Sequence, residues 1–555
     1  MSAVRRLAAL LPGRADLAAM RLQPARDVLA GTMVALVALP LALGFGVSSG
    51  LGAAAGITTA IVAGALAAVF GGSNLQVSGP TGAMTVVLVP IVAEHGADGV
   101  LVVGLLAGLI LLGLAASGAG RFIRYLPVSV VEGFTIGIAV IIALQQVPSA
   151  LGVDVHAEKV LELAARAGVA WVESPHWTAP ALAAGVVAFM LGLTRVRLLP
   201  AALAAVVLAT LAAAVLGLDV RTVGELPSGL PLPSLPSIPF AQLDSLVLPA
   251  VAVAALAALE SLLSATVADA MSVDQRHDPD RELFGQGVAN LVSPLFGGIP
   301  ATAAIARTAV NVRSGAASRL AALTHAVVLL LFVLVAARWV GEIPLAALAG
   351  VLIATAAQMV RVSSAFALIR ATRGDAAVLV TTAVATLVFD LVTAVILGLV
   401  LAGGLALRQT AREARLDEVP LDDAGHSQEE HALLDAHIVA YRLDGPLFFA
   451  AAHDFLLDLT TISDVRVVVL RLSRITSLDA TGAALLADTV RRLERQGITV
   501  MLSGIQPQHD HVLKSLGVYD ELAHQRHVFA TTPEAIAHAR VHAARLEHPS
   551  ADTPV

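Results

Sequence analysis

The sequence contains no cysteine and is poor in aromatic and charged residues. Of its 555 residues, 4% are aromatic and 14% are charged. The lack of cysteine excludes disulfides, thiol catalysis and thiolate-ligated metals. A soluble globular protein carries about 25% charged residues. The shortage of charge, with 57% apolar residues and a mean hydropathy of +0.82, therefore indicates a polytopic membrane protein.

Apolar segments recur along the first three quarters of the chain. Each is long enough to cross a bilayer, or about half that length and next to a glycine or proline break. The segments lie at 28–48, 56–70, 74–93, 99–117, 127–147, 179–194, 198–217, 246–270, 283–296, 299–313, 319–338, 344–361, 374–390 and 391–408. We therefore predict an α-helical polytopic membrane protein with fourteen spans within a transmembrane domain at 27–408.

The distribution of arginine predicts how these spans are oriented. If the N-terminal arm (1–26) is cytoplasmic, the cytoplasmic loops hold most of the arginines, including Arg121, Arg276 and Arg313. The loops on the other face are mainly acidic, with Glu94 and Asp154 among their residues. The positive-inside rule then predicts that both termini are cytoplasmic and that the protein is integral to the cell (cytoplasmic or inner) membrane.

Two stretches interrupt the apolar pattern in the same way. Phe70 to Ala83 and Phe296 to Arg313 each begin with Phe-Gly-Gly and lead through a proline into an apolar helix. Non-helical backbone at membrane depth is tolerated where it is buried in protein or lines a wet cavity. A pair of such breaks in two halves of a chain indicates a transporter binding site, where helix N-termini attract an anion. The alternative is two glycine turns at the membrane edge.

The two halves also share a faint internal repeat. Pro127 followed by Gly133 opens the fifth span, and Pro344 followed by Gly350 opens the twelfth. Because seven spans per half is an odd number, the halves must be inverted in the membrane. We therefore predict a 7+7 inverted repeat with two broken half-helices.

The composition changes after Arg408. An acidic, solvated linker is predicted at 409–435, a small cytoplasmic α/β domain at 436–545 and a disordered tail at 546–555. The hydrophobic pattern of the domain predicts strands at His437–Leu443, Val465–Leu472 and Thr499–Ser503, and helices at Ala450–Leu459, Thr481–Gln496 and His509–Leu516.

Several motifs resemble a known family of anion transporters. They are Gln76-Val-Ser-Gly-Pro-Thr-Gly82, Leu259-Glu-Ser-Leu-Leu-Ser264 and Gly297-Gly-Ile-Pro-Ala-Thr-Ala-Ala-Ile-Ala-Arg-Thr308, together with Gly445 to Ala452 and Ser477 to Gly482 in the tail. The first three resemble the sulfate permease (SulP), or solute carrier 26-type, transporters, and the tail resembles their STAS domain. The resemblance covers about residues 26 to 540.

The resemblance implies an architecture and a mechanism. Spans 1–4 and 8–11 would form a core that moves against a gate of spans 5–7 and 12–14 in an elevator-like alternating-access cycle, often in a homodimer. The cargo would be a small inorganic or organic anion, such as sulfate, bicarbonate or a C4-dicarboxylate. A cytoplasmic protein partner is expected for the STAS domain. The protein is not expected to be an enzyme, because the spans contain no nucleophile–base or metal-ligand constellation, and no nucleic-acid partner is expected.

Glu260 is the main candidate for coupling transport to an ion. It lies in the middle of the eighth span, where an acid is costly unless it is paired, solvated or protonated. Burial would favour its protonated form and make it a proton carrier. It could equally bind Na⁺ together with Ser264, one helical turn later, and Thr302. The competing interpretation is a structural hydrogen bond.

The predicted substrate site combines small residues with one arginine. Small side chains let an anion approach backbone N–H groups, although they also permit close helix packing. Arg307 would attract the anion, as the family's matching arginine suggests, or pair with Glu260. Phe45 would form a wall of the site or belong to the core. The second half-helix is expected to begin at about Ala301, and Ser78 is expected on the first. The full predicted set is Phe45, Ser78, Gly79, Thr81, Gly82, Ala83, Ala301, Thr302, Ala303 and Arg307.

One regulatory residue is predicted in the tail. Thr481 matches the serine or threonine that is phosphorylated in stand-alone STAS domains, although it also fits an ordinary first helical turn after Asp479.

These features favour a secondary active anion transporter that is coupled to H⁺ or Na⁺. Three alternatives stay open at this level: an anion exchanger without cation coupling, a nucleobase-type transporter and a membrane sensor that signals through the STAS domain. The tail and Arg307 argue against the nucleobase transporter, and the sequence shows no output motif for a sensor.

Overall fold

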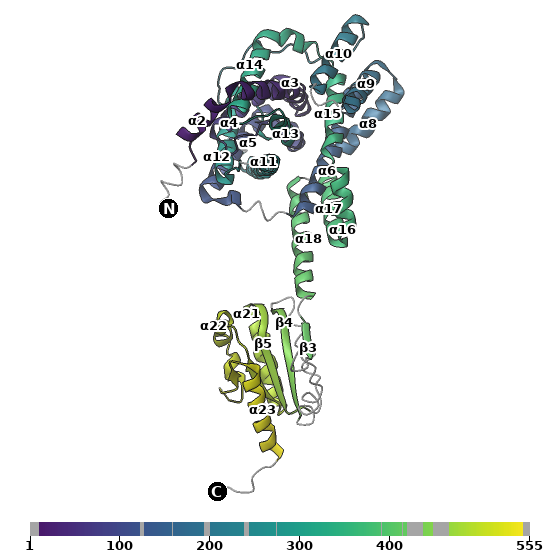
Figure 1. The fold of residues 1–555 in the computed structure, drawn as a ribbon. Coiled ribbons are helices and arrows are strands. Elements are labelled where there is room, and N and C mark those ends of the chain that lie inside the picture. Colours follow the sequence, from purple (N-terminus) through teal and green to yellow (C-terminus); the bar gives the residue numbers. More distant parts are fainter. Residues whose placement is uncertain are drawn as a thin grey trace. The chain divides into compact units, whose positions relative to one another are not determined.

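The computed structural model describes most of the chain. The described residues are 10–121, 127–157, 159–193, 200–237, 243–272, 275–389, 391–412, 415–418, 437–447, 465–524 and 526–547. The chain divides into two compact units, Met1–Val400 and Leu401–Val555. Figure 1 shows both units with their elements labelled.

The first unit contains two groups of packed helices (Figure 1). The first group, called the core here, consists of α3 (Pro24–Ser48), α4 (Ala53–Phe70), α5 (Gly82–Ser117), α11 (Leu243–Met271), α12 (Pro279–Val292), α13 (Ile305–Arg313) and α14 (Leu320–Gly341). The second group, called the gate, consists of α6 (Val128–Gln145), α9 (Thr178–Gly192), α10 (Ala201–Val215), α15 (Leu345–Met359), α17 (Arg373–Val388) and the part of α18 (Leu391–Arg412) that precedes Leu401. This grouping corresponds to the core and gate that the sequence resemblance implied.

Each predicted span corresponds to an observed helix or half-helix. The third and fourth spans are the two halves of α5, which breaks at Gly96, where φ is +68°. Eight helices of the described residues are long and apolar enough to cross a membrane by length and composition, and α9 and α10 are shorter apolar helices. The structure is therefore that of an integral membrane protein, and the count of fourteen spans is consistent with it.

Short helices occupy segments where no span was predicted. They are α2 (Arg14–Leu22), α7 (Val147–Leu151), α8 (Val160–Glu173) and α16 (Val362–Ala371). Helix α2 belongs to the predicted N-terminal arm and is tied to the core, because Asp16 forms ion pairs with Arg281 (2.7 Å) and Arg319 (3.2 Å). Burial alone would raise the pKa of Asp16. The hydrogen bonds from Arg281 and the Gly13 N–H, with the arginine charges, lower this pKa overall.

The two glycine-rich breaks meet in a short antiparallel sheet. Strand β1 (Ser78–Gly79) pairs with β2 (Thr302–Ala303), so that Ser78 lies opposite Ala303 and Gly79 opposite Thr302. This pairing corrects two predictions. The second half-helix begins at Ile305 instead of Ala301, and Ser78 precedes the first half-helix, which begins at Gly82. Both segments stay extended because each uses its backbone groups to pair with the other.

The second unit is an α/β domain. Its sheet has the order β3–β4–β5–β6–β7, in which β3 is antiparallel to β4 and the other pairs are parallel. The elements are β3 (Arg415–Glu418), β4 (Ile438–Leu447), β5 (Val467–Leu478), α21 (Ala480–Arg495), β6 (Thr499–Ser503), α22 (Pro507–Ser515), η5 (Val518–Glu521), β7 (Val528–Phe529) and α23 (Thr532–Glu547).

The sequence predicted most of this domain. The three predicted strands correspond to β4, β5 and β6, and two predicted helices correspond to α21 and α22. The predicted helix Ala450–Leu459 lies outside the described residues. The predicted linker is not entirely irregular, since α18 continues to Arg412 and β3 adds an edge strand to the sheet.

Candidate functional site

The candidate site lies where the N-termini of α5 and α13 follow the paired strands β1 and β2. Thr81 caps α5 and accepts a hydrogen bond from the Met84 N–H (3.3 Å) through its hydroxyl oxygen. Helix α13 follows Ala304, whose side chain cannot cap. The first N–H groups of a helix have no partner within the helix and carry the positive end of its dipole. The two helix ends therefore favour an anion close to both strands.

Glu260 lies directly at the capped end of α5. Its Oε2 accepts a hydrogen bond from the Thr81 hydroxyl (2.9 Å). The carboxylate of span eight is thus placed next to the helix N-terminus of span three. This contact joins two predicted site residues that are 179 positions apart.

The predicted sodium ligands have other hydrogen-bond partners. The Thr302 hydroxyl contacts the Ser261 hydroxyl (3.0 Å) and donates to the Ala257 carbonyl (3.2 Å), while the Ser264 hydroxyl donates to Thr308 (3.1 Å). The hydroxyl groups on α11 hold β2 and α13 in place. Sequence reasoning missed Ser261, although its hydroxyl lies next to Glu260 in a run of Glu-Ser-Leu-Leu-Ser.

Two of the predicted backbone donors are already engaged. The Ala301 N–H donates to the Asn290 side chain (2.8 Å), and the Ala303 N–H donates to the Ser261 hydroxyl (3.2 Å). The structure therefore places these two N–H groups within the protein's own hydrogen-bond network, where they hold the strand. On the second half-helix, the N–H groups of the first turn of α13 are better placed to meet a ligand.

Arg307 of α13 packs against strand β1 and the Pro80 that follows it. Its side chain is 1% exposed, and Nη2 donates a hydrogen bond to the Pro80 carbonyl. A Cβ added at Gly79 would come within 2.5 Å of Nη1, so the guanidinium lies directly against β1. The guanidinium charge is thus held next to β1 while the side chain stays almost completely buried. From this position against β1, the guanidinium charge would attract an anion bound at the helix N-termini, as predicted for Arg307.

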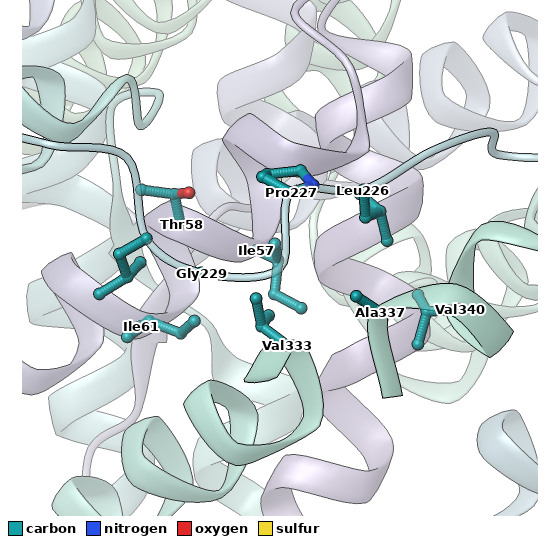
Figure 2. A pocket seen from close by; sticks show the side chains of 10 residues that line it. Ile57, Thr58, Ile61, Leu226, Pro227, Gly229, Val333, Ala337 and Val340 are labelled. Carbon is teal, nitrogen blue, oxygen red and sulfur yellow. The ribbon is translucent and has the colours of Figure 1, made fainter. Parts of the chain in front are cut away.

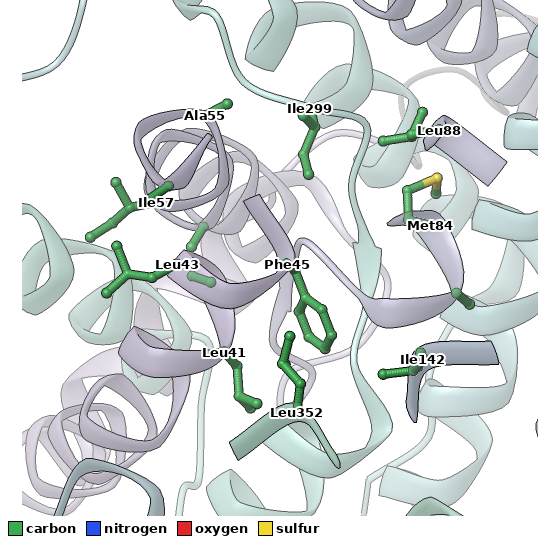
Figure 3. Packing of buried hydrophobic residues seen from close by; sticks show 14 of the residues in the cluster. Leu41, Leu43, Phe45, Ala55, Ile57, Met84, Leu88, Ile142, Ile299 and Leu352 are labelled. Atoms are coloured by element: carbon green, nitrogen blue, oxygen red, sulfur yellow. The ribbon is translucent and has the colours of Figure 1, made fainter. Parts of the chain in front are cut away.

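Apolar side chains lie against the α5 N-terminus and against the neighbouring Gly44 of α3. A Cβ at Gly82 would lie 2.2 Å from Cδ1 of Ile142 and 3.1 Å from Cε1 of Phe45. A Cβ at Gly44 would lie 2.9 Å from Cδ1 of Leu352. Figure 3 shows Phe45 from the core next to Ile142 and Leu352 from the gate. Phe45 lies against the helix end and also belongs to the buried apolar cluster, so its role as a wall of the site stays a prediction. The two gate residues could not be found without knowing how the gate packs.

A second buried acid supports the first strand from behind. Glu282 of α12 accepts hydrogen bonds from the Gly72 N–H (2.9 Å), the Ser73 N–H (3.3 Å) and Gln286 (3.0 Å). Gln286 also donates to the Ser78 hydroxyl (2.7 Å). Sequence reasoning missed this network, and the spacing of Glu282 and Gln286, one helical turn apart, is the signal that could have found it.

Two further features lie away from the helix ends. Figure 2 shows a hollow lined by Ile57, Thr58, Ile61, Leu226, Pro227, Gly229, Leu230, Val333, Ala337 and Val340. This lining carries no charged side chain, so it does not fit an anion. In the second unit, Thr481 is exposed in the first turn of α21, while Asp479 caps the helix by accepting from the Gly482 N–H (2.7 Å).

Most of the chain matches known protein families. The sulfate permease family matches residues 25–382, and the STAS domain matches residues 433–535. YvdB of Bacillus subtilis, which carries the name of a candidate sulfate transporter, is 32% identical over 522 residues, covering 90% of this chain and 95% of that protein. The bicarbonate transporter BicA of Synechocystis sp. is 30% identical over 516 residues, covering 89% and 90%. Both relatives are named as transporters and neither as an enzyme.

Solved structures show the same fold. The transmembrane domain of a cyanobacterium bicarbonate transporter BicA matches with a TM-score of 0.61 at 30% identity, covering 69% of this chain and 98% of that one. The murine solute carrier 26 family member A9 anion transporter in the inward-facing state matches with a TM-score of 0.79 at 19% identity, covering 93% and 91%. The chain therefore belongs to the sulfate permease family of anion transporters and carries a C-terminal STAS domain.

Proposed function

We propose that this protein is a secondary active transporter of a small anion, coupled to H⁺ or Na⁺, that works by an elevator-like movement of the core against the gate. The candidate cargoes are bicarbonate, sulfate and C4-dicarboxylates. The first two are supported by the names of the relatives. The observation that carries the proposal is the meeting of the α5 and α13 N-termini at one antiparallel strand pair, with Glu260 bonded to the cap of α5.

The position of Glu260 supports coupling to a cation. An ionised carboxylate next to the α5 N-terminus competes with an anionic cargo for the same positive field, and it repels that cargo. A proton or a sodium ion on Glu260 would remove the repulsion, so cation binding and anion binding would favour each other. Thr81 links the two events, because its hydroxyl contacts Glu260 and also caps the helix that would receive the anion.

The apolar cover supports the elevator-like movement. Ile142 and Leu352 are gate residues that fill the space next to Gly82 and Gly44 of the core. An anion can approach the N–H groups of α5 only when these side chains withdraw. A shift of the core along the gate would uncover the site as a whole, without rearranging the hydrogen bonds that hold β1, β2 and Arg307 together.

The remaining proposals concern the setting of the transporter. The protein would be a homodimer in the cell membrane, with both termini in the cytoplasm. The STAS domain would bind a cytoplasmic partner, and the exposed position of Thr481 supports phosphorylation there as a means of control.

The function is tested by uptake into proteoliposomes. Labelled bicarbonate, sulfate and fumarate would each be offered under an imposed proton gradient or sodium gradient. We expect one anion to accumulate with one gradient. Uptake that requires an internal anion and ignores both gradients would instead support an exchanger. A folded protein that moves none of the three anions would overturn the proposal.

A further inference from the structure

A buried histidine in the core has no hydrogen-bond partner. His325 lies in the second turn of α14 and is 0% exposed. Neither Nδ1 nor Nε2 has a partner among the residues that the structure describes. Leaving a buried polar group unpaired is costly, so such a group calls for an explanation.

The imidazole lies next to the first residue of β1. A Cβ added at Gly64 would be 3.8 Å from both Cε1 and Nδ1 of His325, and 3.2 Å from the Ser78 carbonyl oxygen. The ring and this carbonyl therefore lie against the same point of α4, at Gly64. Helix α4 brings no ionisable side chain to the contact, since its sequence contains none.

Arg307 of α13 approaches the same strand one residue further along, at Gly79. Its Nη1 also has no partner among the described residues, and it lies against Gly79. His325 and Arg307 are close enough for their charges to interact. The ionisable groups on the other neighbouring helix, α3, are at its cytoplasmic end, where Asp27 accepts from Ser318 and Arg26 donates to Gln23. Among these ionisable groups, Arg307 is thus the one whose charge acts on His325.

We propose that His325 is a positioning residue for anion binding that holds the guanidinium of Arg307 against β1. A neutral imidazole offers one acceptor and one donor. A bridging water would accept a hydrogen bond from Arg307 Nη1 and donate one to the acceptor nitrogen of the imidazole. The N–H of the ring would face the Ser78 carbonyl. A buried site with polar partners of both kinds suits such a water. His325 would then keep the positive charge next to the helix N-termini.

The inference rests on the proposed function and is tested on the full chain. His325→Leu removes both ring nitrogens, whereas His325→Gln keeps one donor and one acceptor without charge. Thr324→Val is the matched control, because Thr324 is the preceding residue on α14 and its hydroxyl bonds only within that helix, to the Leu320 carbonyl. Each variant would be assayed for uptake of labelled bicarbonate and sulfate.

We expect His325→Leu to raise the KM of uptake about tenfold, as when a charged group loses one hydrogen bond, with little change in the maximal rate. His325→Gln and Thr324→Val should stay within about threefold of the unchanged protein. A wild-type KM in His325→Leu would overturn the inference, and so would a KM in His325→Gln that is as high as in His325→Leu.

A binding measurement separates this inference from the proposed function. The thermal unfolding of the detergent-solubilised protein would be followed while sodium bicarbonate or sodium sulfate is titrated at constant ionic strength. A saturable rise in Tm that weakens in His325→Leu and returns in His325→Gln supports the positioning role. If the unchanged protein shows neither a saturable rise nor uptake, the proposed function fails as well. If it shows both and His325→Leu is unaffected, only the inference fails.

Discussion

Glu260 connects the ionisable chemistry of the site to its backbone. The Thr81 hydroxyl that donates to Glu260 also accepts from the Met84 N–H, so the carboxylate and the helix cap share one side chain. A change in the charge of Glu260 is therefore transmitted directly to the end of α5.

Replacing Glu260 by Gln should abolish coupling while the protein stays folded. The amide keeps the size of the side chain but cannot take up a proton or provide a charged ligand for sodium. We expect gradient-driven accumulation in proteoliposomes to fall about tenfold or more. Glu260→Asp, which keeps the charge, is the control. Full accumulation in Glu260→Gln would remove Glu260 from the coupling mechanism.

Gly82 makes a second test possible, because its missing side chain provides the space that Ile142 fills. In Gly82→Ala the new methyl group would lie 2.2 Å from Cδ1 of Ile142, so the core and the gate could not meet as they do here. We expect the rate of uptake to fall about tenfold, with partial recovery in the double variant Gly82→Ala/Ile142→Ala. Independent, additive effects of the two changes would show that this contact has no part in the cycle.

At the scale of elements, the strand pair β1–β2 allows two interrupted helices to end inside a membrane protein. Their backbone groups bond across the pair, to Asn290 and to Ser261. The polar groups of this irregular backbone are hydrogen-bonded in this way without water, as a bilayer requires.

In the second unit, four histidines gather where α23 packs against the sheet.

His527 should make this packing sensitive to pH. It is 2% exposed, and the rings of His524, His538 and His542 lie with centroids 5.6–5.7 Å from its own. Burial, with the charges of the neighbouring histidines, lowers the pKa of His527 to about 4. A histidine has a pKa of about 6.5 in an unfolded chain. The unfolded state therefore binds the proton more readily, and stability contributed by neutral His527 is lost as pH falls from about 6.5 to 4.

Hydrogen exchange of the full chain measures this loss. After correction for intrinsic exchange rates, the amides of α23 should open roughly tenfold more often at pH 5 than at pH 7. His527→Gln should flatten this dependence. His511→Gln, at an exposed position of α22, should leave it unchanged. Equal protection of α23 at both pH values in the unchanged protein would contradict the prediction.

At the scale of the whole molecule, the chain has one unit that carries all of the predicted transport residues and a second that carries the STAS domain. Because the sequence contains no cysteine, single cysteines report on either unit without a background of other thiols.

Single-cysteine labelling tests the proposed orientation. Ser174 lies after α8, on a loop predicted to face outward, and Ser515 ends α22 in the STAS domain; both are exposed. In intact cells, a membrane-impermeant maleimide should label Ser174→Cys, whereas Ser515→Cys should react only after permeabilisation. The reverse pattern would invert the topology, and the unchanged protein should remain unlabelled.

The sequence by itself determined the features that depend on local pattern. Hydrophobic length located the spans, composition separated the membrane unit from the α/β unit, and paired Gly and Pro breaks located the two half-helices. The acid in span eight was evident because an ionisable residue in an apolar run has few structural uses. The same local logic failed at Ala301, where the segment is extended because of a partner more than 200 residues away.

Only the tertiary structure decided which of the predicted residues meet. It joined Glu260 to Thr81 rather than to Ser264, engaged the N–H groups of Ala301 and Ala303, and placed Arg307 behind β1. It also brought Ile142, Leu352 and His325 close to these residues from helices whose sequences are mostly apolar. Such contacts depend on how helices cross in space, and an apolar pattern gives the face of a helix but not the neighbour it packs against.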